Sequence, residues 1–198
     1  MNNNNSNSSR GIVVALKANF LIVEIDFQDS KQFSEKIRLL CTRRSKFEHQ
    51  GLFIHVGDVV FVDSIDYKNK RAVISDLEPR TSFLKRPAVA NVSLIAICIS
   101  VDEPLFDSDQ TSRFLITAES SNIKPIIILT KIDLITKNDL LFIKNKLELW
   151  GYDSIGISIK NVQNIDLLIE RFRETRLTVL AGPSGVGKTS LINHLIPS

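Results

Sequence analysis

The chain has 198 residues, of which 43% are hydrophobic and 24% are charged, and its net charge is +3 at pH 7. This is ordinary globular composition, enough for one large or two small domains, and no apolar run is long enough to cross a bilayer. Cys41 and Cys98 lie far apart and the three histidines are scattered, which argues against a disulfide framework or a metal-ligand spacing. We therefore expect a cytoplasmic protein with free thiols and no membrane contact.

The first nine residues are a polar, Asn- and Ser-rich stretch. They contain no apolar core of the kind that defines a signal peptide. Low-complexity polar segments cannot bury enough apolar surface to fold, so we expect residues 1–9 to be a disordered tail.

Residues 10–78 contain five short segments that are rich in β-branched residues and separated by turn signals. The segments are 11–17, 20–26, 36–42, 58–63 and 71–77. Five short strands predict a small barrel or sandwich, and with a basic surface they favour an all-β OB-type barrel, a fold that often binds nucleic acid. Aromatic residues are few here, which favours recognition of backbone or shape over base reading.

Positive charge is concentrated in this first part of the chain. Residues 10–90 contain 14 Lys and Arg against 10 Asp and Glu, whereas residues 91–198 contain 11 against 12. The cations form three groups, which are Arg38, Arg43, Arg44 and Lys46, then Lys68, Lys70 and Arg71, then Arg80, Lys85 and Arg86. A basic module suggests a polyanionic partner, although an ordinary solvated surface explains the charge equally well.

After residues 79–91, where prolines predict a linker, the hydrophobic period changes. Continuous apolar runs at 94–99, 125–129, 155–157 and 177–181 alternate with helical patterns at 136–149 and 165–172. A capping pattern at Thr136 begins the first helix and Gly151 ends it. Strands buried on both faces and alternating with helices predict a parallel α/β sheet, which binds ligands at the carboxyl ends of its strands.

A phosphate-binding pattern, G-x-x-x-x-G-K-[ST], lies near the end of the chain between a predicted strand and a predicted helix. Its residues are Gly182, Pro183, Ser184, Gly185, Val186, Gly187, Lys188 and Thr189, followed by Ser190. The glycines let backbone N–H groups converge on phosphate oxygens at a helix N-terminus. Lys188 and Thr189 are the candidate catalytic residues, because the lysine would reach the β- and γ-phosphates and the threonine hydroxyl would ligate Mg²⁺. The alternative is a Gly-rich turn that caps a helix.

Thr130, Lys131, Ile132 and Asp133 directly follow the apolar run at 125–129. The carboxylate of Asp133 can accept hydrogen bonds from guanine N1–H and the N2 amine, a pair of donors that adenine lacks. The stem of Lys131 can lie flat against the base. A Lys-x-Asp on an exposed loop is the alternative, but the phosphate loop favours a base-reading role.

Ser158, Ile159 and Lys160 follow the next apolar run. A backbone N–H in this segment could meet the carbonyl oxygen of guanine. A simple turn explains the segment equally well.

The order of these elements is unusual, because in familiar GTPases the phosphate loop comes first. With base reading before the phosphate loop, the chain resembles the circularly permuted small ribosomal subunit biogenesis GTPases, the RsgA family, from about residue 10 to residue 198. The segments that carry the resemblance are 182–193, 131–134, 56–60, 80–87 and 113–115. The resemblance implies an OB-type barrel and a permuted P-loop GTPase domain. It also implies GTP or GDP with Mg²⁺, GTP hydrolysis on the small (30S) ribosomal subunit during late maturation, and contact with its rRNA.

On this basis we predict an OB-fold domain at 10–78, a linker at 79–91 and a permuted GTPase domain at 92–198. The chain departs from the family's pattern in two ways. Thr130 stands where GTPases usually carry Asn, which predicts looser orientation of the base. After the phosphate-loop helix the family continues with switch segments and a zinc-binding domain, whereas this chain stops at Ser198. We therefore expect an exposed edge at strand 177–181, a monomer, weak nucleotide binding and little turnover by the chain alone.

Three other interpretations remain open. A guanylate kinase shares the phosphate-loop sequence but carries it at the start of the chain. Residues 94–100 followed by Asp102 resemble a Walker B strand of an ATPase. The barrel could also make this an RNA- or ribosome-binding module with a vestigial nucleotide site.

Overall fold

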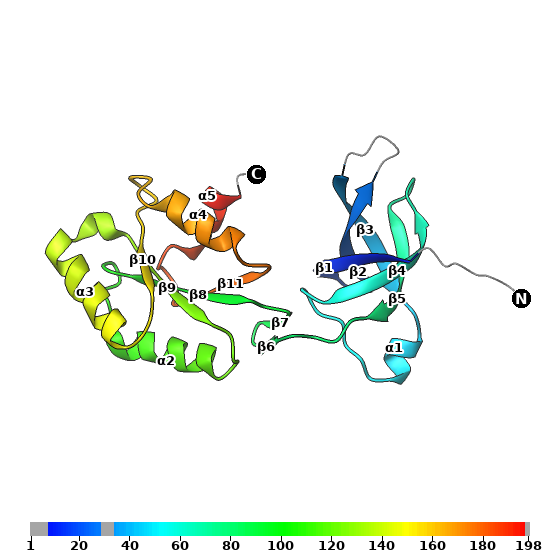
Figure 1. The fold of residues 1–198 in the computed structure, drawn as a ribbon, viewed down its shortest axis with the longest axis horizontal. Helices are drawn as coiled ribbons and strands as arrows, with labels where there is room; N and C mark the ends of the chain where they lie inside the picture. The colour runs from blue at the N-terminus through cyan, green and yellow to red at the C-terminus, as the bar shows by residue number, and fades with distance from the viewer. Residues whose placement is uncertain (1–7, 29–33, 197–198) are drawn as a thin grey trace, which may run out of the picture. The chain divides into compact units, whose positions relative to one another are not determined.

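The computed structural model describes residues 8–28 and 34–196, and the chain forms two compact units, Met1–Asn91 and Val92–Ser198 (Figure 1). Most of the predicted tail lies outside the described residues, and the first strand begins at Ser9. The last two residues of the chain also lie outside the described part. Each unit is described by itself below.

The first unit is a closed barrel in the strand order β1-β2-β3-β5-β4, in which β4 pairs back onto β1. The pairing of β3 with β5 is parallel and the other pairings are antiparallel. The strands are β1 Ser9–Lys17, β2 Phe20–Gln28, β3 Ser34–Arg43, β4 Val59–Asp66 and β5 Arg71–Leu77. This confirms the predicted five-stranded OB-type barrel. A short helix that the sequence reading did not predict, α1 Lys46–His49, connects β3 to β4.

Alternate residues of the strands fill the barrel because successive side chains of a strand point to opposite faces. Val13, Val23 and Leu39 are each 0% exposed, and Phe47 from α1 packs against the same core at 1%. Gly11 permits the tight crossing of β1 and β2, since a Cβ there would lie 2.6 Å from the side chain of Ile25. The apolar alternation visible in the sequence is therefore the barrel core.

Residues 79–91 contain a small antiparallel hairpin, β6 Phe83–Lys85 and β7 Ala88–Ala90. Buried Asn91 fastens the end of this segment, because its amide donates to the carbonyl of Gly57 at 2.9 Å and its side-chain oxygen accepts from the N–H of Thr81. The stretch predicted as a linker thus carries ordered structure of its own.

The second unit has a four-stranded parallel sheet in the order β10-β9-β8-β11. The strands are β8 Leu94–Ser100, β9 Pro125–Thr130, β10 Ser154–Gly156 and β11 Thr178–Ala181, and the helices are α2 Ser108–Glu119, α3 Lys137–Leu149, α4 Ile165–Arg173 and α5 Lys188–Leu195. This confirms the predicted α/β sheet. In the described chain β11 is an edge strand, and its side chains are only partly buried.

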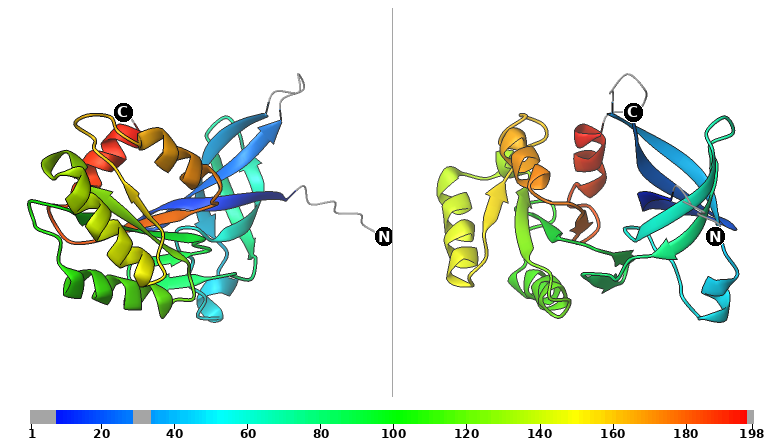
Figure 2. Two further views of the ribbon diagram at one scale, coloured as in Figure 1. Left: turned by 60° about the vertical axis from the view of Figure 1, so that its left-hand side comes forward. Right: turned by 45° about the vertical axis from the view of Figure 1, so that its right-hand side comes forward.

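Helices cover both faces of this sheet, which explains its continuous apolar strands. Leu94, Ala96 and Cys98 of β8 pack in one cluster with residues from α4 and α5. Figures 1 and 2 show α4 and α5 on one side of the sheet and α2 on the other. The loops at the carboxyl ends of the strands therefore follow strands that are packed against helices on both faces of the sheet.

No helix among the described residues is both long and apolar enough to span a membrane.

Candidate nucleotide-binding site

The phosphate loop runs from the end of β11 to the start of α5. Gly182, Gly185 and Gly187 have φ values of 132°, 81° and 93°, which side chains rarely adopt. A Cβ on Gly182 would lie 2.1 Å from the carbonyl oxygen of Cys98 in β8, so the loop passes directly over the neighbouring strand. Only glycine permits this path of the backbone.

Two features of this loop favour the binding of an anion. The ammonium of Lys188 donates to the carbonyls of Gly182 at 2.9 Å and Pro183 at 2.5 Å, which holds its positive charge over the loop. The first N–H groups of α5 have no partner within the helix and point toward the same place. Val186 is 1% exposed and anchors the middle of the loop in the core. The ammonium of Lys188 and the first N–H groups of α5 are therefore donors at the same end of this helix.

The segment predicted to read the base, residues 130–133, lies at the end of β9 and is held in place by buried contacts. We call it the base-reading segment. Ile132 is buried and donates its N–H to the carbonyl of Ile157, which positions the 3₁₀ turn η1 Ile132–Leu134. The hydroxyl of Ser158 donates to Asp133 Oδ1 at 2.5 Å, and Ser158 itself is 0% exposed. The carboxylate is therefore oriented by a buried hydroxyl on the next strand's loop.

The two residues before Ile132 donate hydrogen bonds to other loops of this unit. Lys131, at a φ of 60°, donates its ammonium to the carbonyl of Glu103 in the loop after β8. Thr130 is 1% exposed, and its hydroxyl donates to the carbonyl of Val186 at 2.7 Å. The base-reading segment is thus tied both to the β8 loop and to the phosphate loop.

A cavity of about 410 Å³ lies at the carboxyl ends of the strands, within the size range of small-molecule sites. It is lined by Glu103, Lys131, Asp133, Leu134, Ile159, Lys160, Gly187 and Ser190. These residues follow all four strands of the sheet. Six of the eight belong to the predicted site, and the exceptions are Glu103 and Leu134. Glu103 was not predicted as a site residue because its loop contains no motif. Its position just beyond a buried strand was the available sign that it lies near a ligand site.

The remaining predicted site residues take two other positions. Thr130, Ile132 and Ser158 are buried beneath the cavity. The rest of the predicted set belongs to the phosphate loop and the first turn of α5, and comprises Gly182, Pro183, Ser184, Gly185, Val186, Lys188 and Thr189.

Thr189 is the residue that the sequence predicts to hold a nucleotide-bound Mg²⁺. Its side chain is exposed in the first turn of α5, directly after Lys188. Mg²⁺ in such sites takes one or two protein ligands together with phosphate oxygens and water. Residues 8–28 and 34–196 contain no cluster of three or more His, Cys, Asp or Glu that could hold a metal by themselves. A single threonine hydroxyl as protein ligand is compatible with such a site.

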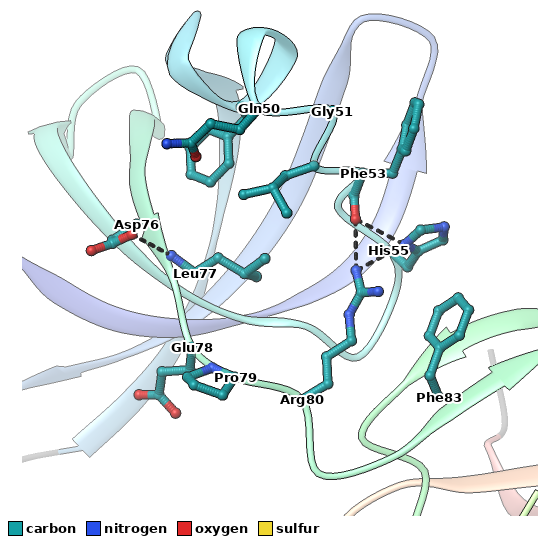
Figure 3. Close-up of a pocket in the computed structure, with 12 residues that line it drawn as sticks. Gln50, Gly51, Phe53, His55, Asp76, Leu77, Glu78, Pro79, Arg80 and Phe83 are labelled. Atoms are coloured by element: carbon teal, nitrogen blue, oxygen red, sulfur yellow. Dashed lines mark hydrogen bonds between the residues drawn. The ribbon is translucent and has the colours of Figure 1, made fainter.

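The barrel has a larger pocket, of about 600 Å³, beside α1 (Figure 3). Its lining includes Phe47, Leu52, Phe53, His55, Leu77, Pro79, Arg80 and Phe83. Buried Asp58 accepts two hydrogen bonds from the Arg80 guanidinium, at 2.7 and 2.8 Å, and this raises the pKa of Arg80 above its usual range. Arg80 also donates to the carbonyl of Phe53 at 2.6 Å. Arg80 thus joins the α1–β4 loop to the segment after β5.

Several cations of the predicted basic surface are engaged in ion pairs. Arg44 pairs with Asp63, Lys46 with Asp76 and Arg38 with Glu24. Such pairs lie at the surface, where they contribute little to stability. The electrostatic attraction of the barrel for a polyanion is therefore weaker than the count of Lys and Arg suggests.

Comparison with known proteins decides the family. The model of the RsgA GTPase family matches residues 77–198. The chain belongs to the RsgA GTPase family. The part of the chain that matches contains both the phosphate loop and the base-reading segment.

Curated relatives carry the name small ribosomal subunit biogenesis GTPase RsgA. The one from Prochlorococcus marinus (strain NATL2A) is 72% identical over 203 residues, an alignment that covers 100% of this chain and 65% of the relative. The one from Parasynechococcus marenigrum (strain WH8102) is 48% identical over 187 residues, covering 94% of this chain and 62% of the relative. The chain thus spans less than two thirds of the length of these RsgA relatives.

Solved structures agree with this assignment. YjeQ from Thermotoga maritima matches with a TM-score of 0.82 and 30% identity over 96% of this chain and 66% of that protein. YloQ, described as a circularly permuted GTPase, matches with a TM-score of 0.78 and 28% identity over 98% of this chain and 66% of that protein. The predicted fold class, an OB-type barrel followed by a permuted P-loop GTPase domain, is confirmed, as is the resemblance to the RsgA family.

Proposed function

We propose that this chain binds a guanine nucleotide at the carboxyl ends of β8, β9, β10 and β11. The observation that carries the proposal is a single cavity of about 410 Å³ lined both by Asp133 and by Gly187 and Ser190. A carboxylate that reads a base and a loop that binds phosphate must lie within one nucleotide of each other. Their shared cavity is the arrangement that such a ligand requires.

The chain's residues divide the work of binding. The loop glycines, Lys188 and the N-terminus of α5 hold the phosphates. Thr189 would hold Mg²⁺, which neutralises charge on the phosphate oxygens when bound. Asp133, oriented by Ser158, accepts from guanine N1–H and the N2 amine, while the stem of Lys131 lies along the base and backbone N–H groups at 159–160 face its carbonyl oxygen. An adenine would leave the Asp133 carboxylate without donors.

We further propose that the protein is a GTPase that assists late maturation of the small (30S) ribosomal subunit, and that the subunit stimulates its hydrolysis. Membership of the RsgA family and the names of its relatives support this role. We propose that it acts in the cytoplasm as a monomer, in contact with rRNA and not with membranes. A test is phosphate release from GTP with and without small subunits, compared with Lys188→Ala; release that the subunit does not raise above this variant would contradict the role.

Nucleotide binding itself is tested by titrating fluorescent GDP and fluorescent ADP into the chain with Mg²⁺. We expect GDP to bind and ADP to bind at least tenfold more weakly, because only guanine satisfies Asp133. Lys188→Ala should weaken GDP binding, whereas Lys137→Ala, an exposed lysine on α3, should not. Equal binding of GDP and ADP would contradict a guanine site.

A second candidate function is RNA binding by the barrel. The observation that favours it is the pocket of Figure 3, which has Phe53 at its rim with 71% of its surface exposed. Exposed aromatic side chains stack on unpaired bases. We expect small-subunit rRNA binding to fall with salt and with Phe53→Ala, and to be unchanged by Phe142→Ala, which alters a phenylalanine of similar exposure in the other unit. Binding that responds equally to both variants would contradict this candidate.

A further inference from the structure

The loops at the carboxyl ends of the parallel strands lie in the same order as the strands themselves, which is β10-β9-β8-β11 (Figure 1). The loop after β10 carries Lys160, the loop after β9 carries Asp133, and the loop after β11 is the phosphate loop. The loop after β8 therefore lies between the base-reading segment and the phosphate loop. In a nucleotide the sugar lies between the base and the phosphates, so this middle loop is placed to face the sugar.

Glu103 is the residue of the middle loop that lines the cavity. Its N–H donates to Asp102 Oδ1 at 2.8 Å, and its carbonyl accepts from the ammonium of Lys131. Ser100, which is 1% exposed at the end of β8, donates to the carbonyl of Asp102. Glu103 has a φ of 50°, a left-handed conformation that persists only where the surrounding contacts fix it. The backbone of Glu103 is therefore held in one conformation at the cavity.

The carboxylate of Glu103, in contrast to its backbone, has no hydrogen-bond or ion-pair partner among residues 8–28 and 34–196. The other carboxylate of the cavity, that of Asp133, already accepts from the hydroxyl of Ser158 at 2.5 Å. An ionised carboxylate has two oxygens that only accept hydrogen bonds. Glu103 thus contributes a free pair of acceptors to the cavity.

A free carboxylate in this position requires a neutral group that carries donors. Close to the phosphates its negative charge would oppose binding, and the donors of guanine are already assigned to Asp133. The two neighbouring hydroxyls of ribose are the donors that remain in a nucleotide, and two carboxylate oxygens can accept from both. Acidic side chains bind ribose hydroxyls in this way in dinucleotide-binding α/β sheets. The chemistry that fits Glu103 is therefore that of a ribose.

We propose that the carboxylate of Glu103 binds the 2′- and 3′-hydroxyls of the sugar and makes the site selective for ribonucleotides over deoxyribonucleotides. This contact was not predicted from the sequence, and it rests on the proposed guanine-nucleotide function. Glu103 is exposed, so water replaces part of each hydrogen bond that is lost, and the selectivity is modest in size.

The test is isothermal titration of the chain with GDP and with 2′,3′-dideoxy-GDP, which lacks both hydroxyls. Unlabelled nucleotides are used because a fluorophore attached to the ribose would mask the groups in question. We expect the unaltered chain to prefer GDP about tenfold, Glu103→Gln, which keeps one acceptor oxygen, to prefer it about threefold, and Glu103→Ala to bind the two within about twofold. Glu170→Ala, which removes an exposed glutamate of α4, is the control and should keep the full preference.

The ratio of the two affinities is the decisive quantity, because removing a negative charge from the cavity changes the binding of both diphosphates alike. Equal affinities of the unaltered chain for GDP and 2′,3′-dideoxy-GDP, with ADP bound more weakly, would overturn the inference and leave the guanine site intact. A preference that Glu103→Ala retains in full would also overturn it. ADP binding equal to GDP, or binding of no nucleotide, would contradict the proposed function and the inference together.

Discussion

The barrel buries Asp58 and Asn91, whereas the α/β unit buries Ser100, Thr130 and Ser158 at or just beyond the ends of three adjacent strands. In the barrel these polar groups close the fold: Asp58 pairs with Arg80, and Asn91 holds the chain at Gly57 and Thr81. In the sheet, each hydroxyl fixes the loop that follows or faces its strand. Buried polar groups thus close the fold in the barrel, whereas those at the strand ends of the sheet hold the loops around the cavity in place.

The three hydroxyls of the sheet act by the same means. Ser100 donates to the carbonyl of Asp102, Thr130 to that of Val186, and Ser158 to the carboxylate of Asp133. A buried polar group without a partner is costly, so each hydrogen bond restricts its loop to one position. The barrel pocket has no such arrangement of hydroxyls in Figure 3; its polar centre is the Arg80 guanidinium.

The largest effect is expected for Gly182→Ala. The added Cβ would lie 2.1 Å from the Cys98 carbonyl at a φ of 132°, so the loop must move away from β8. We expect loss of GDP binding and a fall in unfolding free energy of about 3 kcal/mol or more, measured by chemical denaturation. Gly151→Ala is the control, because its φ is also positive but no atom lies within 4 Å; it should cost about 1 kcal/mol and leave GDP binding unchanged. Similar behaviour of the two variants would contradict the close approach.

Asp58→Ala should lower the stability of the barrel without changing nucleotide binding. Removing this buried carboxylate leaves Arg80, 27% exposed, without its ion-pair partner, and the N–H of His55 without its acceptor. We expect the barrel to lose about 3 kcal/mol of unfolding free energy while the affinity for GDP stays the same. Glu48→Ala, which removes an exposed pair with Arg43, should cost no more than about 0.5 kcal/mol. A matching loss of GDP affinity in Asp58→Ala would show that the two roles are not separate.

Ser158→Ala should weaken the binding of GDP with little effect on the stability of the barrel. The variant removes the hydroxyl that orients Asp133, and hydrogen bonds to charged groups contribute about 1.5–3 kcal/mol, so affinity should fall about tenfold or more. Ser154→Ala lies on β10 outside the cavity lining and serves as the control. Isothermal titration of both variants with GDP decides the point, and equal affinities would refute the orienting role.

A further prediction, which involves no substitution, concerns the thiols, one in the core of each unit. Burial raises the pKa of Cys41 to about 11 and that of Cys98 to about 12, so the reactive thiolate is rare at pH 8. We expect both to react with a thiol reagent at least about a hundredfold more slowly than a free cysteine, and normally once guanidinium unfolds the chain. Fast reaction at one site would identify the unit that opens locally.

The sequence predicted the elements of the barrel and sheet well because their periodicity is strong. The five barrel strands and the four parallel strands were identified from alternation and from continuous apolar runs. The helix at 136–149 was identified from its cap at Thr136, whose hydroxyl accepts from the N–H of Asp139. The helices α1 and α2 were missed, since α1 has four residues and the Asp107 cap that begins α2 was not recognised in the sequence.

Most of the residues that line the cavity were predictable from the sequence, but the contacts between them were not. The glycines and Asp133 could be identified because the chemistry of phosphate and guanine dictates their type and spacing. The hydrogen bond from Thr130 to Val186 joins segments far apart in sequence, and no local pattern encodes it. Glu103, whose carbonyl accepts from Lys131, belongs to no motif, and its position just beyond a buried strand was the only sign of it in the sequence.

Asp133→Asn tests the central claim most directly. We predict that the variant loses its affinity for GDP, because an amide cannot accept from both N1–H and the N2 amine. It should gain affinity for xanthosine diphosphate, because the oxygen at position 2 of xanthine accepts from the new amide. The measurement is competition of each diphosphate against fluorescent GDP for the unaltered chain and against fluorescent xanthosine diphosphate for the variant. An Asp133→Asn chain that keeps its affinity for GDP would contradict the assignment of the cavity as a guanine site.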